Sequence, residues 1–152
     1  MNECMTTKII EFDMGHRVPN HKSKCRNFHG HRYRVEASVK GPIQKDIGQS
    51  DAGMVMDFGD IKAIMMKHIH DVYDHGGMFY VEDHIAQEAM RTAKALDPTQ
   101  NINMVDFIPT AENLAKHFYE IIERELQPPM RLAAVRVYET PNSWADYWGE
   151  EK

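Results

Sequence analysis

The stretch that decides the fold reads His29-Gly30-His31-Arg32-Tyr33-Arg34-Val35-Glu36-Ala37-Ser38-Val39-Lys40. Every second residue from His29 onward is histidine, aromatic or aliphatic, and the residues between them are glycine, serine or charged. Because successive side chains of a β-strand point to opposite faces, this alternation predicts a half-buried strand. Gly41-Pro42 ends it. A strand with one polar face is typical of an antiparallel sheet whose other face packs on the core.

Two histidines open this strand on the same side, because residues i and i+2 share a face. His29 and His31 can therefore reach one ion, and Gly30 between them allows close approach to the backbone. If the preceding strand pairs with this one as a hairpin, His16 returns beside His29. Three neutral imidazoles suit Zn²⁺ and leave a fourth position open, as catalytic zinc sites do. The alternatives are hydrogen-bonded histidines without a metal, or copper, nickel or iron.

Cys25 precedes this histidine pair and is flanked by Lys24 and Arg26. Neighbouring cations and a nearby metal lower the pKa of a thiol and favour the thiolate. The residues alone leave two interpretations. Cys25 is either a fourth zinc ligand, which would make the site closed and structural, or a base just outside the ligand shell.

Asp74-His75 stands at the end of a predicted helix and is followed by two glycines, for which we expect a flexible loop. A carboxylate can orient an imidazole and raise its basicity, as in catalytic triads. Alternatively, Asp74 only ends the helix and His75 interacts with the helix dipole.

Glu139 falls on the same face of a predicted strand as Val135 and Val137. A carboxylate on a buried face needs a partner, because an unpaired buried charge is costly. Two N–H donors of a flat heterocycle would satisfy it bidentately. An ordinary salt bridge, or exposure at the strand end, would do so equally well.

The remaining segments predict a small α+β protein. Apolar residues recur at helical spacing in 58–73 and 110–126, and Thr110 is suited to cap the second of these. A further helix is expected over 83–96, ended by Asp97-Pro98. The expected elements are strands at 5–14, near Val55 and at 131–139, and helices at 58–73, 83–96 and 110–126. This order predicts an antiparallel sheet covered by helices on one face.

Length and composition limit the function. The 152 residues fit one domain. The net charge of −5 disfavours nucleic acid as the main partner, because phosphate binding requires a basic surface. No apolar run approaches the roughly 18 residues of a membrane span, and the first residues do not resemble a secretory signal. With two cysteines, Cys4 and Cys25, we expect free thiols in the cytoplasm.

Six motifs in order resemble the signature of the 6-pyruvoyltetrahydropterin synthase and 6-carboxytetrahydropterin synthase (QueD) family. They are Phe12-x-x-x-His16, Cys25 to His31, Gly53 to Phe58, Asp74-His75, Pro109 to Asn113 and Glu139-Thr140. Three residues separate Cys25 from His29, which resembles the QueD branch, whereas the pyruvoyl synthases typically place five there. The tail Thr140 to Trp144 is also similar to QueD-like proteins.

The resemblance implies a tunnelling fold (T-fold) with an antiparallel four-stranded sheet, assembled into an oligomeric barrel, usually a homohexamer of two trimers. It implies Zn²⁺ on His16, His29 and His31, and Cys25 as the base beside the metal. Asp74 would orient His75 for a second proton transfer, across a subunit interface from Cys25. Glu139 and Thr110 would bind the pterin.

The implied reaction converts 7,8-dihydroneopterin triphosphate, a small-molecule substrate, into 6-carboxy-5,6,7,8-tetrahydropterin, acetaldehyde and triphosphate. It is an early step of 7-deazaguanine and queuosine biosynthesis. The alternatives are 6-pyruvoyltetrahydropterin synthase and a non-catalytic pterin-binding oligomer stabilised by zinc. Arg17, Lys24 and Arg26 carry charge that could meet the triphosphate.

The chain departs from the family pattern in two places. Tyr73 stands before the Asp-His pair where the family usually has leucine. The stretch from Gly76 to Ile108 is longer than in short QueD proteins, so we expect one domain over 1–152 with a helical insertion around 80–104.

Overall fold

The computed structural model describes residues 2–150 and contains one sheet in the order β4-β3-β1-β2-β5-β6. At its centre is a long antiparallel hairpin of β1 (Glu3–His16) and β2 (His29–Pro42). Its register pairs Glu3 with Pro42 at one end and His16 with His29 at the other. The strands predicted at 5–14 and 29–40 are confirmed, and the expected return of His16 to His29 is confirmed with them.

The sheet is larger than predicted and is not purely antiparallel. Beyond β2 it continues antiparallel through β5 (Arg131–Thr140) and β6 (Ser143–Tyr147). On the other side, β3 (Gly76–Tyr80) pairs parallel to β1, and β4 (Ile102–Val105) pairs parallel to β3. The predicted four-stranded antiparallel sheet is therefore wrong in strand number and in the direction of two strands.

Two local predictions fail for related reasons. The flexible loop expected after His75 is the strand β3, although Gly76 and Gly77 favour strands poorly. Its strand conformation comes from pairing with β1 and β4. No strand forms near Val55, whose side chain is nevertheless buried within a bend.

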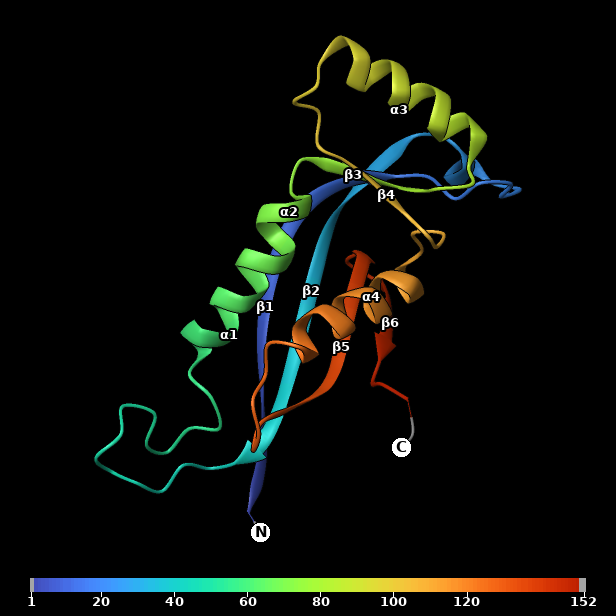
Figure 1. Cartoon of the computed structure of the whole chain (residues 1–152). Helices are drawn as coiled ribbons and strands as arrows, with labels where there is room; N and C mark the ends of the chain where they lie inside the picture. The colour runs from blue at the N-terminus through green and yellow to red at the C-terminus, as the bar shows by residue number, and fades with distance from the viewer. Residues whose placement is uncertain (1, 151–152) are drawn as a thin grey trace.

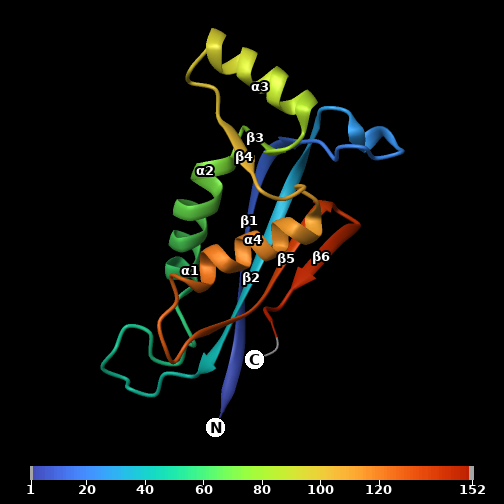
Figure 2. The same ribbon diagram turned by 45° about the vertical axis from the view of Figure 1, so that its right-hand side comes forward.

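Helices cover one face of the sheet, as predicted (Figures 1 and 2). The segment expected at 58–73 is α1 (Phe58–Met65), a π-helical turn and α2 (Asp71–Tyr73). The segment expected at 110–126 contains α4 (Ala111–Glu123), which Thr110 caps by accepting a hydrogen bond from Asn113 N. The core between helices and sheet contains Phe12, Tyr33, Val35, Met65, Leu114 and Phe118, each fully buried.

The helix predicted at 83–96 is α3 (His84–Leu96), which begins at the N-cap Asp83. It lies beyond the end of the sheet, above β3 and β4, and apart from the other helices (Figures 1 and 2). Within His84–Leu96 only Ala86 is buried. Among residues 2–150, no helix has the length and apolar character needed to cross a bilayer.

Candidate active site

Three imidazoles converge where the β1–β2 hairpin meets its connecting loop. One ring nitrogen from each of His16, His29 and His31 lies within 4.8 Å of the other two. The predicted cluster is brought together because His16 pairs with His29, while His31 shares a strand face with His29. His16 is 1% exposed, so the cluster sits partly inside the protein.

Two backbone carbonyls orient the rings. Nδ1 of His16 lies 2.7 Å from the Pro109 carbonyl oxygen, and Nδ1 of His29 lies 2.7 Å from that of Asn27. Because a carbonyl only accepts, each Nδ1 donates its proton and each Nε2 keeps a free lone pair. These two Nε2 atoms face each other at 3.1 Å. Two lone pairs at that distance repel unless a cation lies between them.

Burial favours the neutral form of two of the three imidazoles, those of His16 and His31. Burial lowers the pKa of His16 to about 4, against the opposing effect of the Pro109 carbonyl, and His29 and His31 lower it further. Burial also lowers the pKa of His31, while Glu139 acts in the opposite direction. Neutral imidazoles are the form that binds a metal, so these residues fit a zinc ion.

His31 has an unsatisfied nitrogen that supports this fit. Its Nε2 lies 3.1 Å from Oε1 of Glu139, but it makes no hydrogen bond to any residue within 2–150. The hydroxyl of Tyr33 is also buried without a hydrogen-bond partner in that range. The Tyr33 ring lies 5.7 Å from that of His31 and 5.9 Å from that of His16. Burial, with a smaller contribution from Glu139, raises the pKa of Tyr33 well above its usual value.

Gly30 has a specific steric role between the two histidines. A Cβ atom there would lie 2.9 Å from the backbone oxygen of Met14, closer than side-chain atoms pack. Gly30 pairs with Gly15 across the hairpin, where a Cβ would have 3.4 Å to the nearest atom. The hairpin can therefore close tightly beside the cluster only with glycine at position 30.

Cys25 lies in the β1–β2 loop, within a 3₁₀ turn at Lys24–Arg26. Its carbonyl oxygen accepts a hydrogen bond from Val18 N at 2.9 Å, which ties the turn to the end of β1. The side chain is partly exposed and the thiol is free. The loop thus returns Cys25 to the histidine end of the hairpin.

The Asp74–His75 pair is formed as predicted. Nδ1 of His75 lies 2.8 Å from Oδ2 of Asp74, and Oδ1 of Asp74 accepts from Asp13 N at 3.0 Å. The hydrogen bond from Asp13 and the contact with His75 lower the pKa of Asp74 below its usual value. The carboxylate therefore stays ionised and fixes the ring, whose other nitrogen is free because the His75 side chain is 79% exposed.

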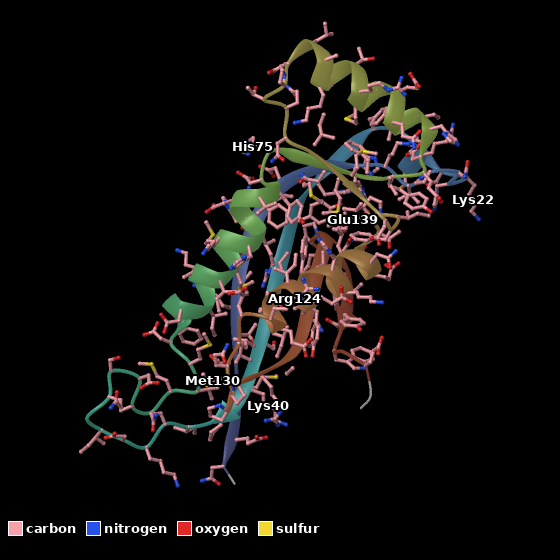
Figure 3. All side chains as sticks on the ribbon, in the orientation of Figure 1. Lys22, Lys40, His75, Arg124, Met130 and Glu139 are labelled. Carbon is pink, nitrogen blue, oxygen red and sulfur yellow. The ribbon has the colours of Figure 1, made fainter. Side chains whose placement is uncertain are left out.

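Two cavities open beside the cluster. His75 lines one of 440 Å³, and Glu139 and Tyr138 line another of 410 Å³. Gly30 and His31 border both. Figure 3 shows His75 and Glu139 at the same end of the molecule. His31 therefore stands between a cavity with an imidazole base and one with a carboxylate.

Two other predicted residues lie outside these cavities. Cys25 lines neither, so within one chain the thiol and the Asp74–His75 pair do not share a cavity. Thr110 also lines neither, but it follows Pro109, whose carbonyl binds His16. The N-terminus of α4 is thereby placed beside the histidines.

The sequence reasoning missed a buried ion pair next to the cluster. Both carboxylate oxygens of Asp83 bind Arg17, through Nε and, at 3.0 Å, through Nη2. Burial raises the pKa of Asp83, but the hydrogen bonds from Arg17 and Ala86 outweigh it and lower the pKa. Only the position of Arg17 directly after His16 could have signalled a role. Its charge suggested a contact with the triphosphate, and the structure shows a residue that is 6% exposed and paired with Asp83.

Comparison with known proteins shows to which family the chain and its fold belong. The sequence profile described as 6-pyruvoyl tetrahydropterin synthase matches residues 5–150. A 6-carboxy-5,6,7,8-tetrahydropterin synthase from Haemophilus influenzae is 32% identical over 142 residues, covering 93% of this chain and 96% of that protein. One from Aquifex aeolicus is 31% identical over 161 residues, covering 93% and 95%.

Solved structures show the same fold. A protein from Wolinella succinogenes superposes with a TM-score of 0.80 at 22% identity, covering 99% of this chain and all of that one. The 6-pyruvoyl tetrahydropterin synthase of Caenorhabditis elegans superposes with a TM-score of 0.68 at 22% identity, covering 99% and 98%. These likenesses confirm the predicted T-fold, here with six strands. With its profile match and its curated relatives, the chain belongs to the 6-pyruvoyl tetrahydropterin synthase family.

Proposed function

We propose that this protein is a zinc-dependent lyase that forms 6-carboxy-5,6,7,8-tetrahydropterin. The substrate would be 7,8-dihydroneopterin triphosphate, which with water yields the carboxypterin, acetaldehyde and triphosphate. The observation that carries the proposal is the pair of imidazole lone pairs facing each other at 3.1 Å, with His31 completing the set. Relatives of nearly the same length bear the name of this synthase.

The metal would be held by His16, His29 and His31. Bound Zn²⁺ would supply Lewis-acid chemistry, lowering the pKa of hydroxyl groups on the substrate side chain. The carbonyls of Pro109 and Asn27 keep the ligand nitrogens unprotonated, which is the state that binding requires.

Two groups would move protons. Cys25, as thiolate, would accept a proton from the substrate side chain, and His75 would carry out the second transfer at its free ring nitrogen. Asp74 supports this role because it holds Nδ1 of His75 and leaves the other nitrogen exposed. Since Cys25 does not line the cavity of His75 in its own chain, we propose that they meet across a subunit interface.

Glu139 would anchor the pterin in the 410 Å³ cavity, where its carboxylate can accept two N–H groups of the ring. Its Oε1 lies 3.1 Å from Nε2 of His31, so a pterin bound there would lie close to the proposed metal. The N-cap residue Thr110 would assist from a neighbouring subunit, because it does not line this cavity in its own chain.

The assembly would be a homo-oligomer, a hexamer of two trimers, working in the cytoplasm. Sheet edges support association, because β4 and β6 each carry one unpaired side. The free thiols Cys4 and Cys25 fit a reducing compartment. We further propose one domain with an insertion around 80–104, and a place in 7-deazaguanine biosynthesis.

The variant Cys25→Ala tests the chemistry, with zinc content and product measured on the same preparation. We expect full zinc content, an unchanged melting temperature and lost turnover. If the variant releases the metal and melts early, Cys25 is a ligand and the role assigned to it is wrong.

Product analysis of the parent protein separates the two synthase reactions. Acetaldehyde and a carboxypterin support the proposal, and a pyruvoyl product would overturn it in favour of 6-pyruvoyltetrahydropterin synthase.

The matched control for Cys25→Ala is Cys4→Ala. This variant removes an exposed thiol near the opposite end of the hairpin and should leave turnover and zinc content unchanged.

A further inference from the structure

Arg17 is a buried cation one residue after a proposed metal ligand. Its side chain is 8% exposed and that of Asp83 is 2% exposed. Both charges are removed from water, so each depends on the other for compensation. Nε and Nη2 of Arg17 bind the two carboxylate oxygens in the bidentate geometry that guanidinium favours.

The same guanidinium also holds the loop that carries Cys25. Nη1 of Arg17 donates to the backbone carbonyl of Arg26, the residue after Cys25. The adjoining Val18 N donates to the Cys25 carbonyl itself. The Arg17 guanidinium lies 5.7 Å from the centre of the Phe28 ring. Arg17 and Val18, just after the end of β1, thus hydrogen-bond to two consecutive backbone carbonyls of the thiol loop, those of Arg26 and Cys25.

Asp83 connects Arg17, and with it the Cys25 loop, to α3. Its Oδ1 accepts from Ala86 N at 3.3 Å and caps the helix, while the same carboxylate binds Arg17. Since Ala86 is the one buried residue of α3, the helix packs little on the main core. The start of α3 lies beside the β1–β2 loop in both views (Figures 1 and 2). The ion pair is therefore the polar connection between α3 and the histidine end.

We infer that Arg17 and Asp83 are positioning residues that hold the Cys25 loop against the end of β1, and that the segment carrying α3 supplies the carboxylate for this purpose. The inference rests on the proposed role of Cys25 as the base. It assigns the segment around 80–104 a function within the site. A misplacement of a reacting group by about 1 Å can cost on the order of 100-fold in rate, so a released loop should lower kcat.

The decisive variant is the double substitution Arg17→Met with Asp83→Asn. Asparagine caps helices as well as aspartate does, so α3 keeps its start. Replacing a buried ion pair by well-packed hydrophobic residues of similar volume is often neutral for stability, and removing both charges together leaves neither of them uncompensated. The double variant therefore keeps the fold but lacks the donor to the Arg26 carbonyl. We expect a melting temperature and zinc content close to the parent, a similar KM, and kcat lower by about 10- to 100-fold.

The single variants Arg17→Met and Asp83→Asn leave an uncompensated charge, and their melting temperatures should fall. If kcat recovers together with melting temperature in the double variant, the pair is only structural and the inference is overturned. If the double variant does not fold, Arg17→Lys tests the inference by the same measurements. Lysine keeps the positive charge but lacks the planar guanidinium that binds Asp83 and the Arg26 carbonyl together. The matched control is Arg131→Met with Glu3→Gln, which removes a bidentate pair at the other end of β1 and should leave kcat unchanged.

A second measurement is independent of turnover. In a Cys4→Ser background, Cys25 is the one thiol of the chain, and its alkylation by iodoacetamide reports how the loop is held. We expect faster alkylation in the double variant, and equal rates would overturn the inference. If the parent does not convert dihydroneopterin triphosphate, the proposed function fails, and the alkylation rates still decide whether Arg17 and Asp83 position Cys25.

Discussion

Strand β1 has an arginine–carboxylate pair at each end, and the two pairs have the same chemistry in different surroundings. At its start, Glu3 binds Arg131 bidentately at 2.7 and 2.8 Å, in solvent. Just beyond its end, Arg17 binds Asp83 with both groups buried. Water screens the first pair and replaces its hydrogen bonds when it breaks, whereas nothing replaces those of the second. Breaking the buried pair should therefore cost more stability than breaking the exposed pair, although both pairs are bidentate.

The two ends of the hairpin differ in what lies beside the ion pair. At the Glu3 end, the pair joins β1 to β5 in solvent and can rearrange without affecting the candidate site. The His16 end carries buried imidazoles whose lone pairs must stay free of protons. A cation fixed one residue away in solvent-excluded surroundings needs its own carboxylate, or it would perturb that cluster.

The largest effect is expected from Arg17→Met, which leaves Asp83 buried without its partner. We expect the free energy of unfolding to fall by about 3–5 kcal/mol, because an uncompensated buried charge remains. Urea denaturation of the metal-free protein measures this directly. A loss below about 1 kcal/mol would show that water reaches Asp83 and that the two ends do not differ as described.

Gly30→Ala tests the tight closure at the histidine end. The new Cβ would lie 2.9 Å from a backbone oxygen that cannot move alone, so we expect a loss of about 1–3 kcal/mol and weaker zinc binding. The control is Gly15→Ala on the opposing strand, where the nearest atom is 3.4 Å away and a smaller loss should follow. Equal effects from the two substitutions would contradict the special position of Gly30. Thermal unfolding with and without zinc gives both quantities.

At the other end, Arg131→Met should leave the urea midpoint and the zinc content unchanged within error. Glu3 keeps Lys40 at 3.5 Å and is open to water, so the loss of Arg131 leaves no buried charge. A midpoint shift as large as that of Arg17→Met would remove the contrast between the two pairs.

The smallest effect is a pH dependence at the solvent-exposed pair. Hydrogen bonding to Arg131 lowers the pKa of Glu3 from 4.5 to about 2, opposed by its partial desolvation. A carboxylate with a depressed folded-state pKa stabilises the protein fully above its unfolded value, and this contribution is lost as pH falls through the folded value. Stability should thus show a small loss between about pH 4.5 and 2 that Glu3→Gln abolishes. A pH profile unchanged by Glu3→Gln would mean that the pair contributes nothing measurable.

Much of the histidine end could be predicted from local pattern. The alternation from His29 to Lys40 set the strand and its buried face, and the His-x-His spacing put two imidazoles on one side. The cap at Thr110 and the helix after it follow equally from short-range chemistry. These features depend on neighbours within a few residues, which is the range that periodicity and capping describe.

Other features required contacts between distant segments. The parallel pairing of β3 with β1 is invisible in a glycine-rich stretch without alternation. The 3.1 Å contact between the Glu139 carboxylate and His31 forms only because β5 lies beside β2. The free ring nitrogens of the candidate metal site depend on carbonyls contributed by Asn27 and Pro109.

The central hairpin, the face on which its histidines lie and the family of the chain could all be read from the residues, because strand alternation and short motifs are encoded within a few positions. The six-stranded sheet, the burial of Arg17 against Asp83 and the start of α3 beside the thiol loop became apparent only in the folded protein. A charged residue can be either solvated or buried. Which occurs depends on whether a partner from 66 positions away along the chain arrives to replace its water.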